Sequence, residues 1–376
     1  MKEFEPISIS EYGSFSVLGT QDNEIFNHYL TDNHFFNTFE GNLCSPIQFS
    51  NKDIITHLNE SKPHYIKLDR SVLLALKSAE NLFEKLNWKT TDAIGINIAS
   101  SRGATHLWEK YITEFNKHNK VSTLVSPTTS LGNISSWVAN HLKIQGPNFS
   151  HSMTCSGSFY AILNACAWIN SGMIEKMIVG GSEAAITQFT IEQFKALRIY
   201  SNSNEKYPCL AGNFEKKINT MIIGEGGMLL GLEKKSSPNS IKIKSIGYAS
   251  EMIHHPVSLS REAENCQKAM QLAKKDYEID IIITHTPGTI KGDLAEFEAI
   301  KKVFGKNIPL LTNNKWKLGH TFGASGVLSL EMALLMLKKQ QFFSTFDNEN
   351  PKMKIENILI NTMGFGGNAV SILVGI

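Results

Sequence analysis

The sequence predicts an α/β protein with a layered architecture and two similar halves. Apolar runs typical of buried strands alternate with amphipathic or wholly apolar runs typical of helices through most of the chain. This alternation favours a mostly parallel sheet with helices on its faces. A length of 376 residues also exceeds what one hydrophobic core usually holds, so two fused units are expected.

The first half is expected to cover residues 1–235. Its first 65 residues or so are rich in Asn, Phe and Ser and are predicted to be irregular. Beyond them, the sequence predicts helices at Leu68–Leu86, Ser130–Leu142 and Phe159–Ile169, and strands at Ala93–Ala99, Met177–Glu183 and Met228–Leu232.

The second half is expected to cover residues 236–376, after a Lys-, Ser- and Pro-rich linker at 234–240. Its plan is similar to that of the first half, although no sequence repeat relates the two. The predicted helices are Arg261–Lys274, Asp293–Phe304 and Gly326–Lys338, and the predicted strands are Ile241–Tyr248, Ile279–Thr284, Pro309–Thr312, Ile358–Asn361 and Ala369–Val374.

Composition and charge exclude several classes of protein. A net charge of +2 gives little of the positive charge that proteins use to bind nucleic acid. No apolar run reaches the roughly 18 residues of a spanning helix, and the N-terminus lacks the plan of a signal peptide. Five scattered cysteines without a CxxC pair argue against a disulfide framework or a zinc site. We therefore expect a cytoplasmic protein without a metal.

Cys155 is the first candidate for chemistry. It lies among small residues in Ser152-Met-Thr-Cys-Ser-Gly-Ser158, directly before the predicted helix Phe159–Ile169. Backbone N–H groups at a helix N-terminus favour a thiolate, which is the nucleophilic form of cysteine. Cys166, inside the helix, has no such neighbours and is interpreted as a packing residue. Most cysteines in such proteins are inert core residues, so the small neighbours carry the interpretation.

Two histidines in glycine-containing turns are the second candidates. His285 follows the apolar strand Ile279–Thr284, and carboxyl ends of strands in open α/β sheets face the ligand crevice. His320 stands in the segment Gly319–Gly326, shortly after Lys315. Each histidine alone could equally well be a packing residue. Gly364-Phe-Gly-Gly367 could be a plain hairpin or could turn an N–H towards a developing oxyanion.

Together these motifs resemble the β-ketoacyl-ACP synthases of the thiolase superfamily, in the branch with a Cys-His-His site. The resemblance covers the chain from about Leu68 to the C-terminus and implies a thiolase-like fold with layers αβαβα. Its motifs, in order, are Thr154-Cys-Ser-Gly157, Gly180-Gly-Ser-Glu-Ala-Ala185, Gly224-Glu-Gly226, His285 with Thr289, Asp293 and Glu296, Lys315 with Gly319-His320, and Gly364-Phe-Gly-Gly367.

The resemblance implies a role for each catalytic residue. Cys155 accepts an acyl group from an acyl carrier protein, and His285 and His320 hold the thioester carbonyl of a malonyl unit. Lys315 completes the catalytic set. The N–H groups of Cys155 and Phe365 hold the oxyanion, and Phe365 also serves as the gate to the acyl pocket.

The resemblance also implies substrate contacts and partners. Thr289, Gly364 and Gly366 bind substrate, and Arg198 meets the acidic carrier protein, unless it is simply a solvated arginine. The protein needs no cofactor of its own, because phosphopantetheine arrives on the carrier. It forms a homodimer, or a heterodimer with a related subunit, through an edge segment at Asn148–Met153.

Several positions depart from the family pattern. Pro287 stands where the family usually has threonine, and Met221 stands where it has phenylalanine. Ser329 replaces a glutamate nine places after His320, while Glu331 follows on a different helix face. Lys315 is therefore expected to lack its usual partner. These changes bear on the malonyl step, not on the nucleophile.

Three functions remain open from the sequence. The first is a condensing enzyme that extends an acyl chain in fatty acid or polyketide-like synthesis, for instance of an aryl polyene pigment. The second is a non-catalytic subunit similar to a chain length factor, which Pro287 and Ser329 favour. The retention of Cys155, His285, His320 and Lys315 argues against it. The third is a non-decarboxylating thiolase or acyltransferase, which the pair of histidines disfavours.

Overall fold

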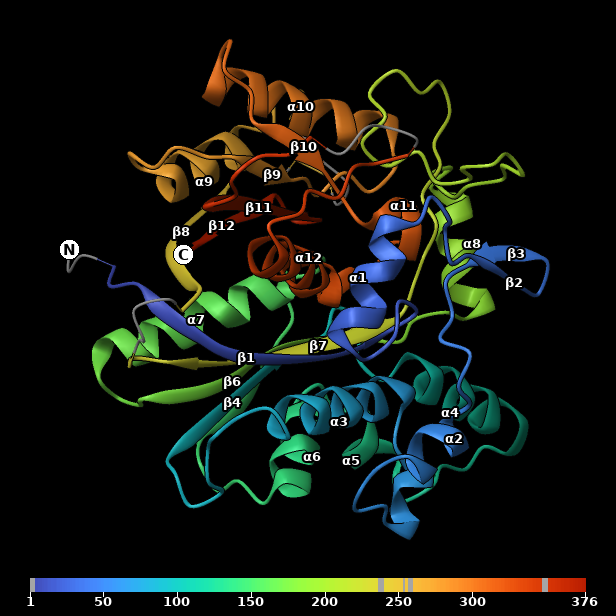
Figure 1. Ribbon diagram of the computed structural model, residues 1–376. Coiled ribbons are helices and arrows are strands. Elements are labelled where there is room, and N and C mark those ends of the chain that lie inside the picture. The colour runs from blue at the N-terminus through green and yellow to red at the C-terminus, as the bar shows by residue number, and fades with distance from the viewer. Residues whose placement is uncertain (1–3, 236–239, 253, 256–259, 347–350) are drawn as a thin grey trace.

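Ten strands form one mixed sheet at the centre of the protein (Figure 1). The structure is a computed structural model that describes residues 4–235, 240–252, 254–255, 260–346 and 351–376. Four of the seven predicted linker residues, 236–239, lie outside the described residues. The strands are β1 Ile7–Ser16, β4 Ile94–Ala99, β5 Asn148–His151, β6 Lys176–Glu183, β7 Gly226–Glu233, β8 Lys242–Ser250, β9 Ile281–Ile283, β10 Leu310–Thr312, β11 Asn357–Gly364 and β12 Asn368–Gly375; β2 Asn37–Phe39 and β3 Asn42–Cys44 pair separately.

The sheet consists of two runs of five strands with the same topology. In the first run the order is β1-β7-β6-β4-β5, and in the second it is β8-β12-β11-β9-β10. In each run the first three strands pair antiparallel and the outer pairs are parallel. β1 and β8 join the two runs through the register Ile7–Ile243 and Ser8–Lys242. A common fold plan therefore relates halves that share no sequence repeat.

Helices make three layers around the two strand runs (Figure 1). α7 and α12 contact each other in the middle layer, α3 and α6 cover the first run, and α9 and α10 cover the second. The helices are α1 Asp22–Leu30, α2 Asn51–Thr56, α3 Arg70–Phe83, α4 Thr105–His118, α5 Val125–Thr129, α6 Asn133–Leu142, α7 Gly157–Ser171, α8 Gln188–Ala196, α9 Glu264–Lys274, α10 Ile290–Phe304, α11 Lys315–Leu318 and α12 Ser325–Lys339, with 3-10 turns η1 Pro63–Lys67 and η2 Phe322–Ala324. The predicted layered α/β fold with two similar halves is confirmed.

Two details of the sequence-based prediction are wrong. The N-terminal segment is not irregular, because it forms β1 and α1, and β1 is one of the two strands at the joint of the sheet. Alternating apolar residues in Ile7–Ser16 fit a strand with a period of two. The sheet is also mixed rather than mostly parallel. In the first run β7 pairs antiparallel with both β1 and β6, and in the second run β12 pairs antiparallel with both β8 and β11.

The middle layer holds the largest apolar core. α7 is apolar on nearly all sides, as predicted, and α12 is buried from Ser325 to Leu337. A helix that is apolar all round is stable only where neighbouring elements cover it, which α7 and α12 do for each other between the two strand runs. This packing fixes the N-terminal ends of both helices relative to the sheet.

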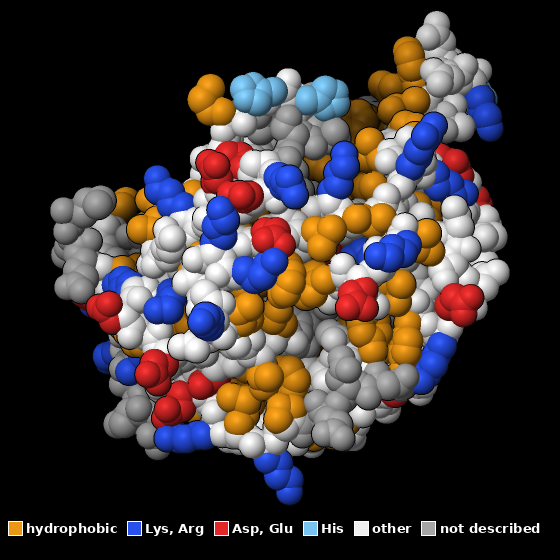
Figure 2. All heavy atoms as spheres, turned by 90° about the horizontal axis from the view of Figure 1, so that it is seen from above, with side chains coloured by type: hydrophobic (Ala, Val, Ile, Leu, Met, Phe, Trp, Pro, Cys, Tyr) orange, Lys and Arg blue, Asp and Glu red, His pale blue; other side chains and the backbone are white. Residues whose placement is uncertain are grey.

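The surface over α9 and α10 shows no field of a single charge. Figure 2 shows lysine and arginine side chains interspersed with acidic and hydrophobic ones on this face. In the part of the chain that the structure describes, no helix is both long and apolar enough to cross a membrane. The expected cytoplasmic location stays a prediction.

We predict that Glu331 makes stability depend on pH. This carboxyl lies buried in α12 near Ser14 and Tyr29, and burial raises its pKa to about 7. The unfolded chain has the ordinary, lower pKa, so the stabilising protonated form is lost as the pH rises towards 8. Between pH 5 and pH 8, urea unfolding should show wild-type stability falling by about 2 to 3 kcal/mol more than that of Glu331→Gln. A Glu175→Gln variant, changed at an exposed position, should behave as wild type.

Candidate active site

Cys155 lies in a tight turn between β5 and α7. Thr154 has a φ of 48°, which is unfavourable for a residue other than glycine. The N–H groups of Ser156 and Gly157 close the turn on the carbonyls of Met153 (3.1 Å) and Thr154 (3.2 Å). The strained turn sets the sulfur at the N-terminus of α7, where Cys155 keeps 9% of its surface exposed.

His320 contacts the cysteine directly. Its Nε2 lies 3.1 Å from Cys155 Sγ, and its Nδ1 lies 3.3 Å from Ser325 Oγ at the start of α12. Gly319 precedes it with a φ of 75°, and a Cβ there would come within 3.0 Å of the Ile222 carbonyl oxygen. Glycine is therefore required where this chain passes close to the 222–224 backbone.

His285 joins the pair from the end of the neighbouring strand in the second strand run. It follows β9 through Thr284, and its ring centre lies 5.3 Å from that of His320 at an interplanar angle of 82°. Glu296 of α10 holds its backbone, accepting from the N–H groups of His285 (2.9 Å) and Thr286 (2.8 Å). Cys155, His320 and His285, which are far apart in the sequence, thus meet in one place.

All three reactive groups are neutral near pH 7. Burial raises the pKa of the Cys155 thiol to about 12, with the charge of Glu183 adding to the effect and Lys315 opposing it. Burial, together with the charge of Lys315, lowers the pKa of His320 to about 3 and holds the pKa of His285 well below its ordinary value. Desolvation therefore outweighs the tendency towards a thiolate that the helix N-terminus was expected to give Cys155.

Lys315 is buried at the start of α11. Burial lowers its pKa to about 8, and the main charges that oppose this shift are the carboxylates of Glu296 and Asp293. Ser329, which stands where the family has a glutamate, donates from its Oγ to Asn314 Oδ1 at 3.4 Å. Glu331 faces away, towards Ser14 and the charge of Asp22. Lys315 therefore lacks a carboxylate at position 329 but has two others nearby.

The Gly364–Gly367 turn packs against the nucleophile's backbone. A Cβ at Gly364 would lie 3.2 Å from the Cys155 nitrogen and closer still to Thr154 Oγ1, so only glycine fits. The carbonyl of Phe365 accepts from Thr154 Oγ1 (3.1 Å), while the Phe365 residue is 43% exposed. Gly366 has a φ of 93° within the same turn.

Apolar side chains surround Cys155 on its other side. They form a cluster that the sequence analysis did not predict, although Met221 and residues of two quoted motifs belong to it. Its members besides the cysteine are Cys44, Ala185, Ile186, Ile191, Phe194, Tyr200, Met221, Ile223 and Phe322. The Phe322 ring lies 5.3 Å from those of both His320 and Phe194. The cluster gives the Cys155 sulfur an apolar environment.

The remaining predicted contact residues have other visible roles. Thr289 caps α10, because its Oγ1 accepts from the Gly292 N–H at 3.2 Å. Arg198 is exposed after the end of α8, with a φ of 57°, and its carbonyl accepts from Asn219 Nδ2 at 2.9 Å. Within the described residues, no cluster of His, Cys, Asp and Glu is arranged to hold a metal ion.

Two supporting interactions were not foreseen. The buried carboxylate of Glu183 accepts from Ser100 Oγ, Ser101 N, Arg102 N and Gly323 N, which ties the end of β6 to η2 beside His320. Lys216 forms an ion pair with Asp293 at 2.6 Å. Motifs marked Glu183 and Asp293, but not their partners, because hydrogen-bond partners that are distant in sequence leave no periodic pattern.

A cysteine at a helix N-terminus that faces histidine is typical of acyltransferases that work through a covalent thioester. Comparison with known families agrees with this class. Residues 46–237 match the model of the β-ketoacyl synthase N-terminal domain, and residues 240–348 match that of the C-terminal domain. The chain belongs to the β-ketoacyl synthase family. The 3-oxoacyl-[acyl-carrier-protein] synthase 2 of Coxiella burnetii (strain RSA 493 / Nine Mile phase I) is 27% identical over 333 residues, which cover 80% of each chain.

Solved structures of ketosynthases share the fold. A chain of the structure of the ketosynthase ApeO in complex with its chain length factor ApeC, from Xenorhabdus doucetiae, matches with a TM-score of 0.83, 22% identity and 100% of both chains covered. The AntDE:AntF structure, a type II polyketide synthase carrier protein in complex with its ketosynthase, matches with a TM-score of 0.85, 18% identity, and 99% and 100% of the two chains. The predicted thiolase-like fold is thus confirmed.

We predict that His320 sets the reactivity of Cys155. Because its neutral Nε2 is placed to take the thiol proton, His320→Ala should slow alkylation of Cys155 by iodoacetamide about tenfold or more. Mass spectrometry of digests at timed intervals would measure the rate. His285→Ala is the matched control and should have a smaller effect. Fast labelling of the buried Cys166 would reveal unfolding, and equal rates for the two variants would contradict the prediction.

We also predict that the influence of Lys315 fades as the pH rises. Its ammonium, charged below a pKa of about 8, favours the thiolate of Cys155. At pH 7, Lys315→Met should therefore slow Cys155 alkylation about three- to tenfold relative to wild type. At pH 9 the wild-type lysine has lost most of its charge, so the two rates should converge. A ratio that stays constant from pH 7 to pH 9 would contradict this role.

Proposed function

We propose that this protein is a β-ketoacyl-ACP synthase that condenses an acyl thioester with malonyl-ACP and releases carbon dioxide. The observation that carries this proposal is the 3.1 Å contact between Cys155 Sγ and His320 Nε2, with His285 beside it. Fatty acid, polyketide or aryl-polyene-like synthesis would use such a reaction. The nucleophile comes from the proposed first half, residues 1–235, and both histidines come from the proposed second half, residues 236–376.

The first step loads the acyl group. Cys155 Sγ attacks the carbonyl of the acyl carrier thioester while His320 Nε2 takes the thiol proton. The new carbon–sulfur bond forms as the bond to the carrier's phosphopantetheine breaks, and His320 returns its proton to the leaving thiol. The N–H groups of Cys155 and Phe365 are proposed to hold the oxyanion. The apolar cluster around Cys155 then shelters the chain.

The second step forms the carbon–carbon bond. The carboxylate of malonyl-ACP leaves as carbon dioxide, and its bonding electrons move into an enolate whose oxygen is held by His285 and His320. The enolate carbon attacks the Cys155 thioester and expels the sulfur, and a proton from solvent restores the thiol. Neutral imidazoles suit this step, because a neutral imidazole N–H can donate a hydrogen bond to the enolate oxygen without transferring its proton.

A non-catalytic role similar to that of a chain length factor is the second candidate. Ser329 favours it, because no carboxylate stands at that position. The intact contact between Cys155 and His320 favours catalysis, since a subunit without chemistry has no need of a buried thiol on an imidazole. The partner we propose in both cases is an acyl carrier protein, which Arg198 would meet, together with a second ketosynthase-type subunit. The edge strand β5 is where that subunit would pair.

The loading step predicts an acyl adduct. After incubation with acyl carrier protein charged with chains of several lengths, intact-mass spectrometry should show an acyl group on Cys155. Cys155→Ala should carry none, and Cys166→Ala, changed at a buried cysteine outside the site, should load as wild type. Absence of an adduct with every chain length would support the non-catalytic candidate.

A further inference from the structure

We propose that Lys216 is a positioning residue for His285, acting through Asp293. This inference rests on the proposed function, because it assigns Lys216 to the malonyl step and not to the loading of Cys155. Lys216 belongs to none of the motifs that mark the family in this sequence. It lies in residues 208–221, the segment that ends at Met221.

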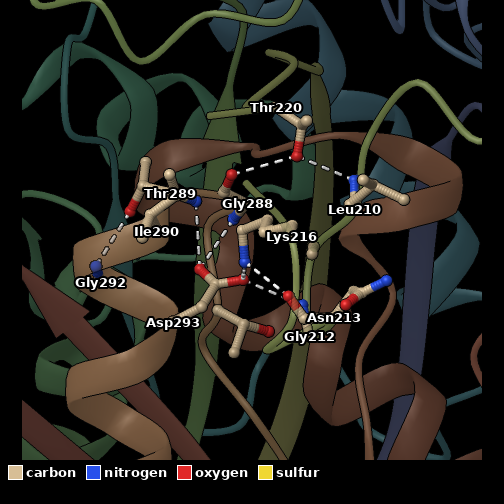
Figure 3. A network of polar contacts seen from close by, with 12 residues as sticks. Leu210, Gly212, Asn213, Lys216, Thr220, Gly288, Thr289, Ile290, Gly292 and Asp293 are labelled. Atoms are coloured by element: carbon tan, nitrogen blue, oxygen red, sulfur yellow. Dashed lines mark hydrogen bonds and ion pairs between the residues drawn. The ribbon is translucent and has the colours of Figure 1, made fainter. Parts of the chain in front are cut away.

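The ion pair between Lys216 and Asp293 is fully buried. Lys216 Nζ lies 2.6 Å from Asp293 Oδ2, and the two side chains are 1% and 0% exposed. Nζ also donates to the Asn213 carbonyl at 3.0 Å, and the same Oδ2 accepts from the Gly212 N–H at 3.0 Å (Figure 3). Removing one partner of such a pair leaves an uncompensated buried charge, which is strongly unfavourable.

The other oxygen of Asp293 holds the turn that follows His285. Its Oδ1 accepts from the N–H groups of Gly288 (3.0 Å) and Thr289 (3.1 Å). Thr220 grips the same turn from the opposite side, because its N–H (2.9 Å) and Oγ1 (3.1 Å) both donate to the Gly288 carbonyl (Figure 3). Segment 208–221 therefore fixes Gly288, three residues from the imidazole.

The charge of Lys216 offsets part of the effect of burial on the Asp293 carboxyl. Burial raises the pKa of Asp293, and the charge of Lys216 is the largest opposing influence. Without the lysine, the Asp293 carboxyl would lose its ion-pair partner and become a weaker, less well-placed acceptor for the Gly288 and Thr289 amides. This effect reaches the turn that carries His285, while the contact between Cys155 and His320 stays intact.

We expect Lys216→Met to separate the two half-reactions. Loading of Cys155 should stay within about twofold of wild type, while carbon dioxide release from malonyl-ACP should fall about a hundredfold, as misplaced catalytic groups typically cause. Lys217→Met is the matched control, since the neighbouring lysine is exposed, and it should leave both rates unchanged. Lys216→Arg, which keeps the charge, should recover part of the carbon dioxide release.

Hydrogen exchange supplies a readout that does not depend on activity. Amides of residues 284–294 should exchange faster in Lys216→Met than in wild type or Lys217→Met, while those of α12 stay unchanged. Equal exchange and equal carbon dioxide release in the two Met variants would overturn the inference. So would faster exchange throughout the chain, or no recovery with arginine. A wild type that loads Cys155 but releases no carbon dioxide would instead overturn the proposed function, and the exchange result would still decide whether Lys216 holds the turn.

Discussion

The site depends on burying a thiol and two imidazoles against one another without charge. Desolvation raises the pKa of Cys155 and lowers the pKa values of His285 and His320, so a proton must move between them at the moment of attack. The 3.1 Å contact between Cys155 Sγ and His320 Nε2 lets the proton pass directly from the thiol to the imidazole. Neutrality also lets the three groups share an apolar environment, where isolated charges would be too costly to keep.

The duplicated topology is what allows this meeting. Each strand run leads into one part of the site: the first run leads into Cys155 at the start of α7, and the second leads into His285 after β9. The packing of α7 against α12 then brings His320, whose Nδ1 approaches Ser325 of α12, onto the sulfur. The close-packed apolar core around α7 and α12 deforms little, which holds the thiol and the imidazoles at fixed distances from one another.

Sequence alone predicted the parts of the protein that local pattern encodes. The layered fold, most helices and strands, and the three reactive residues follow from periodicity and motif. The strand Ile7–Ser16 was not predicted, because its few apolar residues stand among serines and give only a short alternating pattern. The charge state of Cys155 could not be foreseen, because it depends on burial by residues from distant segments. The same holds for Lys216, whose partner Asp293 lies 77 positions away.

The hydrogen bonds of the turn after His285 explain why proline is tolerated at position 287. Glu296 takes the N–H groups of His285 and Thr286, and Asp293 takes those of Gly288 and Thr289. Pro287 has no N–H, so it stands at the one place in the turn where a missing donor costs nothing. Two carboxylates, three residues apart on α10, therefore accept from every backbone N–H of the turn from His285 to Thr289, and their charges also act on Lys315. No carboxylate stands at position 329, so Glu296 and Asp293 both hold the amides of the turn and supply the negative charge near Lys315. For this reason the charge of Asp293, and hence its ion pair with Lys216, matters to the site.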